Sequence, residues 1–194
     1  MLEQPLPNLC ADRIDYNMQG SYFQKFMTKE EIQELFLDLS FENEKWTFTN
    51  QELAAKLASF SLFMTEDCWG SAKNFITSKW LADAISKGFE IGLISSDEFH
   101  FGTDQLIWDR LSKSQDLLIQ DRMQKLLFPD QYYHLVETEK ADLLIPFKNR
   151  GIDPWIKHNQ RTVRLTSLNP ALNEALQIMK QRSASGWPVK FTGH

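Results

Sequence analysis

The sequence has few cysteines, no basic excess and no long apolar segment, and each shortage argues against a class of protein. Two cysteines, Cys10 and Cys68, are too few for a disulfide framework or a zinc site, so we expect the reducing environment of the cytoplasm. The net charge of −5 argues against a nucleic-acid partner, because such binders usually carry a strong basic excess. No apolar run approaches the ~20 residues that a membrane-spanning helix needs, so we expect no membrane partner.

The composition is that of an ordinary globular chain, with 42% hydrophobic and 24% charged residues among 194. A chain of this length favours one domain that buries roughly two-thirds of its unfolded surface. A glycine-rich phosphate loop is absent, since "GSAKNF" lacks the Walker pattern. The function therefore has to be sought in other motifs.

Most of the chain has the periodicity of amphipathic helices. In residues 8–19 the apolar side chains at helical spacing are Leu9, Cys10, Ile14 and Met18, and Pro7 favours a helix start there. The opposite face collects Asp12, Asp15, Tyr16 and Gln19 at positions i, i+3, i+4 and i+7. This spacing predicts an early helix with one buried and one polar face.

Two capping boxes are expected before the next two helices. Thr28 with Glu31 and Thr49 with Glu52 have the spacing in which a hydroxyl and a carboxylate bond the backbone reciprocally. The expected buried stripes are Ile32, Leu35, Phe36 and Leu39 in the first of these helices, and Leu53, Leu57, Phe60 and Met64 in the second. "KWTFT" between them is compatible with a strand or an extended connector.

Further helices are expected at about 71–87, 96–100, 104–113 and 114–127. After Pro129, short β-rich segments alternate with turn-like "KNRG" and "KHNQ", and a last helix starts at Asn169-Pro170 and ends by Gly186. The expected fold is mainly α, with a small β-hairpin or three-stranded element near 132–166. We expect a helical part, 1–128, and a part with a strand pair and terminal helix, 129–194, in one compact unit.

The segment "ADRIDY" resembles the closing motif of the HD-domain superfamily, which comprises metal-dependent phosphohydrolases. In its dNTP-triphosphohydrolase-like branch the last metal ligand is the first aspartate of an Asp-(Arg/Lys)-x-Asp-Tyr helix. "PFKNRGIDPWI" followed by "RTVRLTSLNP" also looks like the tail of bacterial HD-domain proteins. The resemblance thus extends over much of the chain and implies the helical fold of the C-terminal part of an HD domain.

The resemblance implies a role for each residue of the motif. Asp12 corresponds to the metal ligand, Arg13 to the basic residue that reaches substrate phosphate, Asp15 to a supporting carboxylate and Tyr16 to the aromatic wall of the substrate pocket. The implied cofactor is a divalent metal, Mn, Fe or Mg, and the implied substrate is a phosphate ester or nucleotide. The family often has an acidic residue four positions after the tyrosine, where this sequence has Gly20.

The metal ligands that precede this motif in the family are a histidine and a His-Asp pair, and neither lies before Asp12. The four histidines are His100, His134, His158 and His194, and none is followed by aspartate. We therefore expect the chain to be inactive alone and to need a missing N-terminal half or a partner chain. The alternative is a non-catalytic remnant or helical interaction module, and an uncovered apolar side would then favour self-association.

Two other clusters have simpler explanations. Asp97, Glu98, His100 and Asp104 could hold a metal, although helix caps in a loop between helices explain them as well. The basic residues of the tail could receive phosphate or an acidic partner, but they also fit the solvated face of strands. These basic residues are Lys148, Arg150, Lys157, Arg161 and Arg164.

Overall fold

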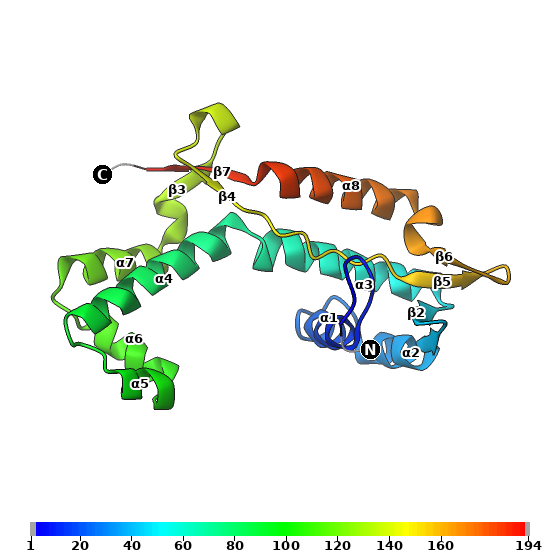
Figure 1. The fold of residues 1–194 in the computed structure, drawn as a ribbon, viewed down its shortest axis with the longest axis horizontal. Coiled ribbons are helices and arrows are strands. Elements are labelled where there is room, and N and C mark those ends of the chain that lie inside the picture. The colour runs from blue at the N-terminus through cyan, green and yellow to red at the C-terminus, as the bar shows by residue number, and fades with distance from the viewer. Residues whose placement is uncertain (1–2, 193–194) are drawn as a thin grey trace. The chain divides into compact units, whose positions relative to one another are not determined.

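The computed structural model describes residues 3–192, and within them the mainly α fold class is confirmed (Figure 1). The α-helices are α1 (Ala11–Phe23), α2 (Lys29–Asp38), α3 (Gln51–Phe63), α4 (Ala72–Glu90), α5 (Ser96–Phe101), α6 (Asp104–Ser112), α7 (Leu117–Leu127) and α8 (Pro170–Ser185). The strands are β1 (Ser40–Glu42), β2 (Lys45–Phe48), β3 (Tyr133–Leu135), β4 (Leu143–Ile145), β5 (Trp155–His158), β6 (Arg161–Arg164) and β7 (Trp187–Phe191). In this part of the chain no helix is both long and apolar enough to cross a membrane.

One of the two expected capping boxes forms. Thr28 accepts a hydrogen bond from the Glu31 backbone at 3.2 Å, and the Glu31 carboxylate accepts from the Thr28 backbone at 2.8 Å. The second box was wrong, because α3 starts one residue later than expected. Asn50 accepts from the Leu53 backbone at 3.1 Å, while the Thr49 hydroxyl bonds the Asp38 carboxylate at the end of α2.

The apolar stripe expected in α3 is buried, but the stripe expected in α2 is only partly so. Leu53, Leu57, Phe60 and Met64 all lie in the core. In α2, Leu35 is fully buried, whereas Phe36 remains 64% exposed. Helix α2 contacts α1 and α3, and Phe36 lies at the edge of its apolar stripe that these two helices leave uncovered.

The contacts group the chain into two compact units, and the chain passes between them after Gly70, Ile145 and Ser185. The first unit comprises residues 3–70 and 146–185, and the second comprises residues 71–145 and 186–192. Each unit combines segments that are far apart in the sequence.

In the first unit, α3 packs against α1, α2 and α8 (Figure 1). It continues into a π-helical turn, Met64–Trp69, and Arg182 of α8 forms an ion pair with Glu66 of this turn. The early helix is amphipathic as expected, because Leu9, Cys10, Ile14 and Met18 are all buried. The burial of this face fixes which side of α1 points outward.

The strands of the first unit form a four-stranded sheet in the order β1-β2-β5-β6. Strands β2 and β5 are parallel, with Thr47 opposite Trp155, and the hairpins on either side are antiparallel. Both hairpins turn through two residues with positive φ, Asn43-Glu44 and Asn159-Gln160, as two-residue turns with matching twist require. "KWTFT" therefore contains a strand.

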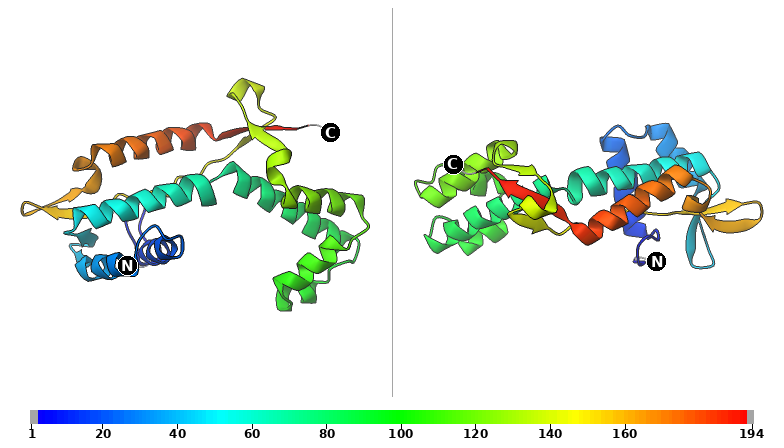
Figure 2. Two further views of the ribbon diagram at one scale, coloured as in Figure 1. Left: turned by 180° about the vertical axis from the view of Figure 1, so that it is seen from behind. Right: turned by 90° about the horizontal axis from the view of Figure 1, so that it is seen from above.

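The second unit contains α4, α5, α6 and α7, with α4 packed along α7 (Figure 2). Its core is built from apolar side chains of these helices and of the loop after α4: Ala84, Ile94, Ile107, Leu111, Ile119 and Met123. A three-stranded sheet, in the order β3-β7-β4, packs on the first half of α4 through Ile145 and Val189.

The strand element expected near 132–166 contains the β5–β6 hairpin, but the segment is shared between two sheets. The segment holds four strands, but β3 and β4 belong to one sheet and β5 and β6 to the other. The unexpected strand β7 follows the last helix and lies between β3 and β4, pairing with both antiparallel. Pro188 sits within β7, so it does not end regular structure there.

Candidate functional site

The candidate site begins at the first turn of α1. Cys10 is the N-cap residue, with no side-chain hydrogen bond to the helix. Asp12 lies in the exposed first turn, where a carboxylate is favoured by the positive end of the helix dipole. Asp15 is exposed one turn later and accepts a hydrogen bond from Gln19 at 3.0 Å. Both carboxylates thus stand on the outward face of the helix.

Arg13 is directed toward the segment that precedes α1. Its Nη1 donates to the carbonyl oxygens of Gln4 and Asn8, each at 2.7 Å. The guanidinium therefore holds the N-terminal loop, residues 3–9, against the start of the helix. The expected role of Arg13 in binding substrate phosphate stays a prediction, and the observed contacts give this residue a structural task.

Tyr16 is half-buried and packs against the π-helical turn that follows α3. Its ring meets Trp69 edge-to-face, with 5.1 Å between ring centroids and an interplanar angle of 90°. Burial raises the pKa of the Tyr16 phenol, and the positive charges of Arg13 and Arg150 oppose that rise. Tyr16 thus remains a neutral hydrogen-bonding group at neutral pH, with one aromatic partner already in place.

Gly20 lies where helices α1 and α3 approach each other. A Cβ atom at this position would be 3.0 Å from Cζ of Phe60, which is fully buried. Any side chain at this position would therefore enter the interface between the two helices.

The described residues do not fit a metal ion on their own. Within residues 3–192 no group of three or more His, Cys, Asp or Glu side chains is arranged to hold one. His100 interacts through Nδ1 with the Ser96 carbonyl, 2.8 Å away, and His158 through Nε2 with Asn159, 3.0 Å away. His194 lies outside the described residues. Asp12 could serve as a ligand only together with groups from elsewhere.

The acidic cluster around His100 is explained by helix capping. The Glu98 carboxylate accepts from the Ser95 backbone and hydroxyl, both at 3.0 Å, and forms an ion pair with Arg110. These contacts lower the pKa of Glu98, through the backbone hydrogen bond of Ser95 first. The Glu98 carboxylate therefore caps the start of α5.

The basic residues of the tail do not act as one group. Lys157 forms an ion pair with Glu42 at 2.6 Å, across the four-stranded sheet. The guanidinium of Arg164 stacks on Trp155, and Arg161 is exposed at the other end of β6. These contacts therefore do not join the five residues into a single phosphate-binding surface.

An open groove lies beside the polar face of α1. It has a volume of about 850 Å³ and is bordered by Asp15 and Gln19. Its apolar walls come from Ile14, Met18, Tyr22 and Phe23 of α1, Ile32 and Phe36 of α2, and Trp46 of β2. We call it the α1–α2 groove. Phe23 and Phe36 are among the most exposed aromatic side chains of this unit.

The chain matches no model of a known protein family. Among curated proteins it is similar to the uncharacterized protein YdhJ of Bacillus subtilis (strain 168), with 26% identity over 197 residues. The alignment covers 98% of this chain and 58% of that protein, so the chain spans less than two thirds of the length of its relative. The name of the relative assigns no activity to it.

Proposed function

We propose that this chain is the C-terminal part of an HD-type metal-dependent phosphohydrolase that acts on a phosphate ester or nucleotide. In this proposal Asp12 supplies one metal ligand, and the histidine and His-Asp ligands come from a second segment outside this sequence. The observation that carries the proposal is the position of Asp12, exposed in the first turn of α1 and one turn from the α1–α2 groove.

The groove supports the docking of such a segment. A large exposed apolar surface is rare on a monomeric protein and usually marks an interaction site. A helix that laid apolar side chains into the α1–α2 groove would come to lie beside Asp12 and Asp15. The relative is also long enough to contain a further segment, because this chain spans only 58% of it.

Several features of the site agree with the same proposal. Tyr16 sits one turn after Asp12 with a neutral phenol and an aromatic neighbour, which suits the wall of a substrate pocket. Asp15 accepts a hydrogen bond from Gln19 and lies exposed on the same side of α1 as Asp12, one turn further on. Arg13 fixes the start of α1 through the carbonyl oxygens of Gln4 and Asn8, and a contact from Arg13 to substrate phosphate remains part of the proposal.

The alternative is a partner-binding module without catalysis, and the same groove favours it. The two functions differ in what Asp12 does. In the hydrolase Asp12 is required for metal binding, whereas in a binding module only the apolar residues of the groove matter. Metal affinity therefore distinguishes the two.

The test uses the natural gene product that contains this sequence, together with the isolated chain. We expect the isolated chain to bind no Mn²⁺ at micromolar concentration in calorimetry. We expect the natural product to bind Mn²⁺ and to hydrolyse p-nitrophenyl phosphate or a nucleoside triphosphate. Asp12→Ala should lower Mn²⁺ affinity by more than about 100-fold, since even partners that only orient a ligand contribute roughly 10–100-fold.

Asp104→Ala is the matched control, because Asp104 is an aspartate in the first turn of α6 and lies outside the motif. It should leave affinity and hydrolysis unchanged. The proposal is overturned if Asp12→Ala behaves like Asp104→Ala. Absence of both Mn²⁺ binding and hydrolysis in the natural product would also overturn it, and would leave the binding module.

A further inference from the structure

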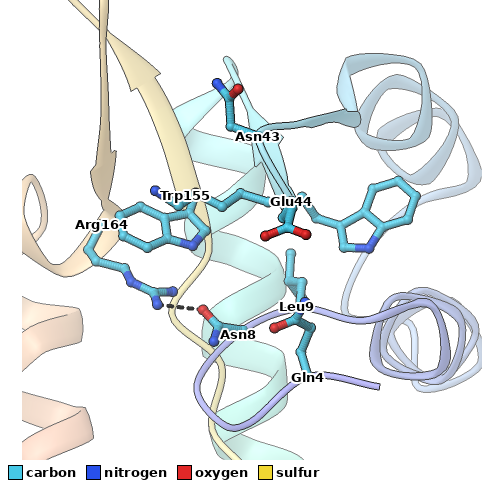
Figure 3. A pocket seen from close by; sticks show the side chains of 9 residues that line it. Gln4, Asn8, Leu9, Asn43, Glu44, Trp155 and Arg164 are labelled. Carbon is cyan, nitrogen blue, oxygen red and sulfur yellow. Dashed lines mark hydrogen bonds between the residues drawn. The ribbon is translucent and has the colours of Figure 1, made fainter. Parts of the chain in front are cut away.

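A second cavity of the first unit lies at the four-stranded sheet, and Asp12 is not among the residues that line it. It has a volume of about 280 Å³ and is enclosed by the N-terminal loop, the turn between β1 and β2, and strands β5 and β6 (Figure 3). The side chains that matter for its chemistry are Asn8, Glu44, Lys45, Trp46, Trp155 and Arg164. This volume is at the small end of ligand pockets, which are roughly 300–1,000 Å³.

Two cations stand on the wall of this cavity at the ring of Trp155. The guanidinium carbon of Arg164 is 3.7 Å from the ring centroid, and Nζ of Lys45 is 4.3 Å from it. Within residues 3–192 neither cation forms an ion pair with a carboxylate. Arg164 donates to the Asp153 carbonyl and to the Asn8 amide oxygen, which are neutral acceptors. The Asp153 carboxylate therefore offsets part of the charge of Arg164 through space, without an ion pair.

The net charge of the lining favours an anion. Glu44 is the one carboxylate that lines the cavity, against the two cations, so the lining carries a formal charge of +1. Figure 3 shows the Glu44 carboxylate apart from the Arg164 guanidinium, on the side of Leu9. A bound molecule would thus meet positive charge at one end and a hydrogen-bond acceptor at the other.

The wall of the cavity is held in place before any ligand arrives. Arg13 binds the carbonyl oxygens of Gln4 and Asn8 at 2.7 Å each, which fixes the N-terminal loop. The Asp153 backbone N–H donates to the Pro7 carbonyl at 3.0 Å, and ties the same loop to the segment before β5. Side chains that are ordered in advance lose less entropy on binding, which raises affinity.

We infer that this cavity binds a small organic anion, a carboxylate or a phosphate ester, that carries a hydrogen-bond donor at its other end. The anionic group contacts Lys45 and Arg164, and the donor, an ammonium or hydroxyl group, contacts Glu44. Hydrogen bonds between a guanidinium and an anion are short and about twice as strong as neutral ones. The inference is independent of the proposed hydrolase activity, since it uses neither Asp12 nor a metal.

The test titrates the purified chain with three small probes and follows tryptophan fluorescence and calorimetric heat. The probes are L-serine as the carboxylate, phosphoethanolamine as the phosphate ester, and ethanolamine as the donor without an anion. We expect one of the first two to bind with a Kd below about 1 mM, and ethanolamine not to bind. Which of the two binds identifies the anionic group.

Substitutions of Lys45 and Arg164 test whether the anionic group of the ligand contacts these two cations. Lys45→Gln and Arg164→Gln should each weaken binding by about tenfold or more, which corresponds to ~1.4 kcal/mol. Arg161→Gln is the matched control, because it removes the same charge from the same strand at an exposed position that does not line the cavity. Its affinity should equal that of the unchanged chain.

Arg164 also donates a hydrogen bond to Asn8, so Arg164→Gln could loosen the N-terminal loop. The fold of this variant is therefore checked first by circular dichroism. If that variant is unfolded, Lys45→Gln decides, since Lys45 makes no hydrogen bond to the loop. The inference is overturned if neither anionic probe binds up to about 10 mM. Equal weakening by Arg161→Gln and Lys45→Gln, or equal binding of ethanolamine, would overturn it as well.

Discussion

At the scale of the residue, Arg13 shows how one side chain of a motif acquires a structural role. Its Nη1 reaches two carbonyl oxygens of the N-terminal loop, at 2.7 Å each. Hydrogen bonds from a charged donor contribute about 1.5–3 kcal/mol each, more than neutral ones. The loop that forms a wall of the small cavity therefore depends on a residue of α1.

Arg13→Gln should release the N-terminal loop. Loss of the charged hydrogen bonds should raise amide hydrogen exchange in residues 3–10 by about tenfold or more, the change that ~1.4 kcal/mol of lost stabilisation gives. Mass spectrometry of exchange in the peptide that contains these residues measures the effect, with Arg161→Gln as the charge-matched control. Unchanged protection would show that these contacts do not hold the loop.

At the scale of the element, the start of α2 and its contact to α3 rest on one carboxylate. Glu31 closes the capping box with Thr28 and forms an ion pair with Lys56 of α3 at 2.7 Å. The hydrogen bond from Lys56, followed by that from the Thr28 backbone, lowers the pKa of Glu31 below its usual 4.5. Both contacts require the ionised carboxylate.

The lowered pKa of Glu31 gives a defined dependence on pH. Because the folded-state pKa lies below the unfolded value, the stabilisation is present above 4.5 and is lost as the pH falls through the folded pKa. Glu31→Gln should remove this part of the acid sensitivity. Urea unfolding of both proteins at pH 7 and at progressively lower pH measures it, and parallel pH profiles would contradict the assignment.

The cap itself is tested at neutral pH. Thr28→Ala should lower stability by about 1 kcal/mol, the usual cost of losing an N-cap hydroxyl. Thr49→Ala is the informative comparison, because Thr49 caps no helix here and bonds Asp38 instead. Helix content by circular dichroism and the urea midpoint distinguish the two, and an equal loss of helix in both variants would contradict the different roles.

Gly20 lets α1 and α3 pack closely against each other. Alanine is ordinarily better than glycine within a helix by about 1 kcal/mol, but an added Cβ would press on the buried Phe60 ring at 3.0 Å. Overpacking of this kind costs about 1–3 kcal/mol, so Gly20→Ala should be neutral to destabilising, and Gly20→Asp clearly destabilising. Chemical denaturation measures both.

Phe60→Leu supplies the control for this helix contact. In the double variant Gly20→Ala with Phe60→Leu, the smaller side chain leaves room for the added methyl group. The cost of Gly20→Ala should therefore be smaller in the Phe60→Leu background than alone, by about 0.5 kcal/mol or more. Strictly additive costs would show that Phe60 does not limit the approach of the two helices.

At the scale of the whole molecule, exposed apolar side chains on α2 accompany the open α1–α2 groove. Phe36 is 64% exposed and Leu37 is 84% exposed, and both belong to a helix of ten residues. The sequence predicted a chain with an uncovered apolar side that tends to self-associate. Self-association is still a prediction, and it would depend on the exposed residues Phe36 and Leu37.

Phe36→Gln combined with Leu37→Gln should reduce concentration-dependent association. Polar side chains at exposed sites usually alter stability by less than about 0.5 kcal/mol, so the fold should be retained. Sedimentation velocity over a range of concentrations measures the association. Leu117→Gln, at a position 81% exposed in the other unit, is the control, and an equal effect there would mean that the groove has no special role.

The difference between prediction and structure is clearest at α2 and the strands. The Thr28–Glu31 box and the buried face of α3 were predictable, because they depend on residues three or four positions apart. The pairing of β2 with β5 was not, because it joins segments more than 100 residues apart in the sequence. The exposure of Phe36 depends on which neighbours cover α2, and periodicity alone does not contain that information.

The candidate functional residues also include some that the sequence predicted and some that it did not. The row of Asp12, Asp15 and Tyr16 on one helix could be seen in the sequence, and its assignment as a metal and substrate site remains a proposal. The small cavity could not, because Trp46, Trp155 and Lys45 have no motif spacing. Their only signal was a tryptophan in each of two separate short segments, "NEKW" and "DPW".

The sequence by itself determined most of the helices, the Thr28–Glu31 capping box and the outward row on α1, because these follow from local spacing along one chain segment. Only the tertiary structure decided the partners of Arg13, the two separate sheets and the cavity at Trp155. The physical reason is that these features need segments distant in sequence to meet. Their contacts depend on the packing of the whole unit, which no local pattern of side chains encodes.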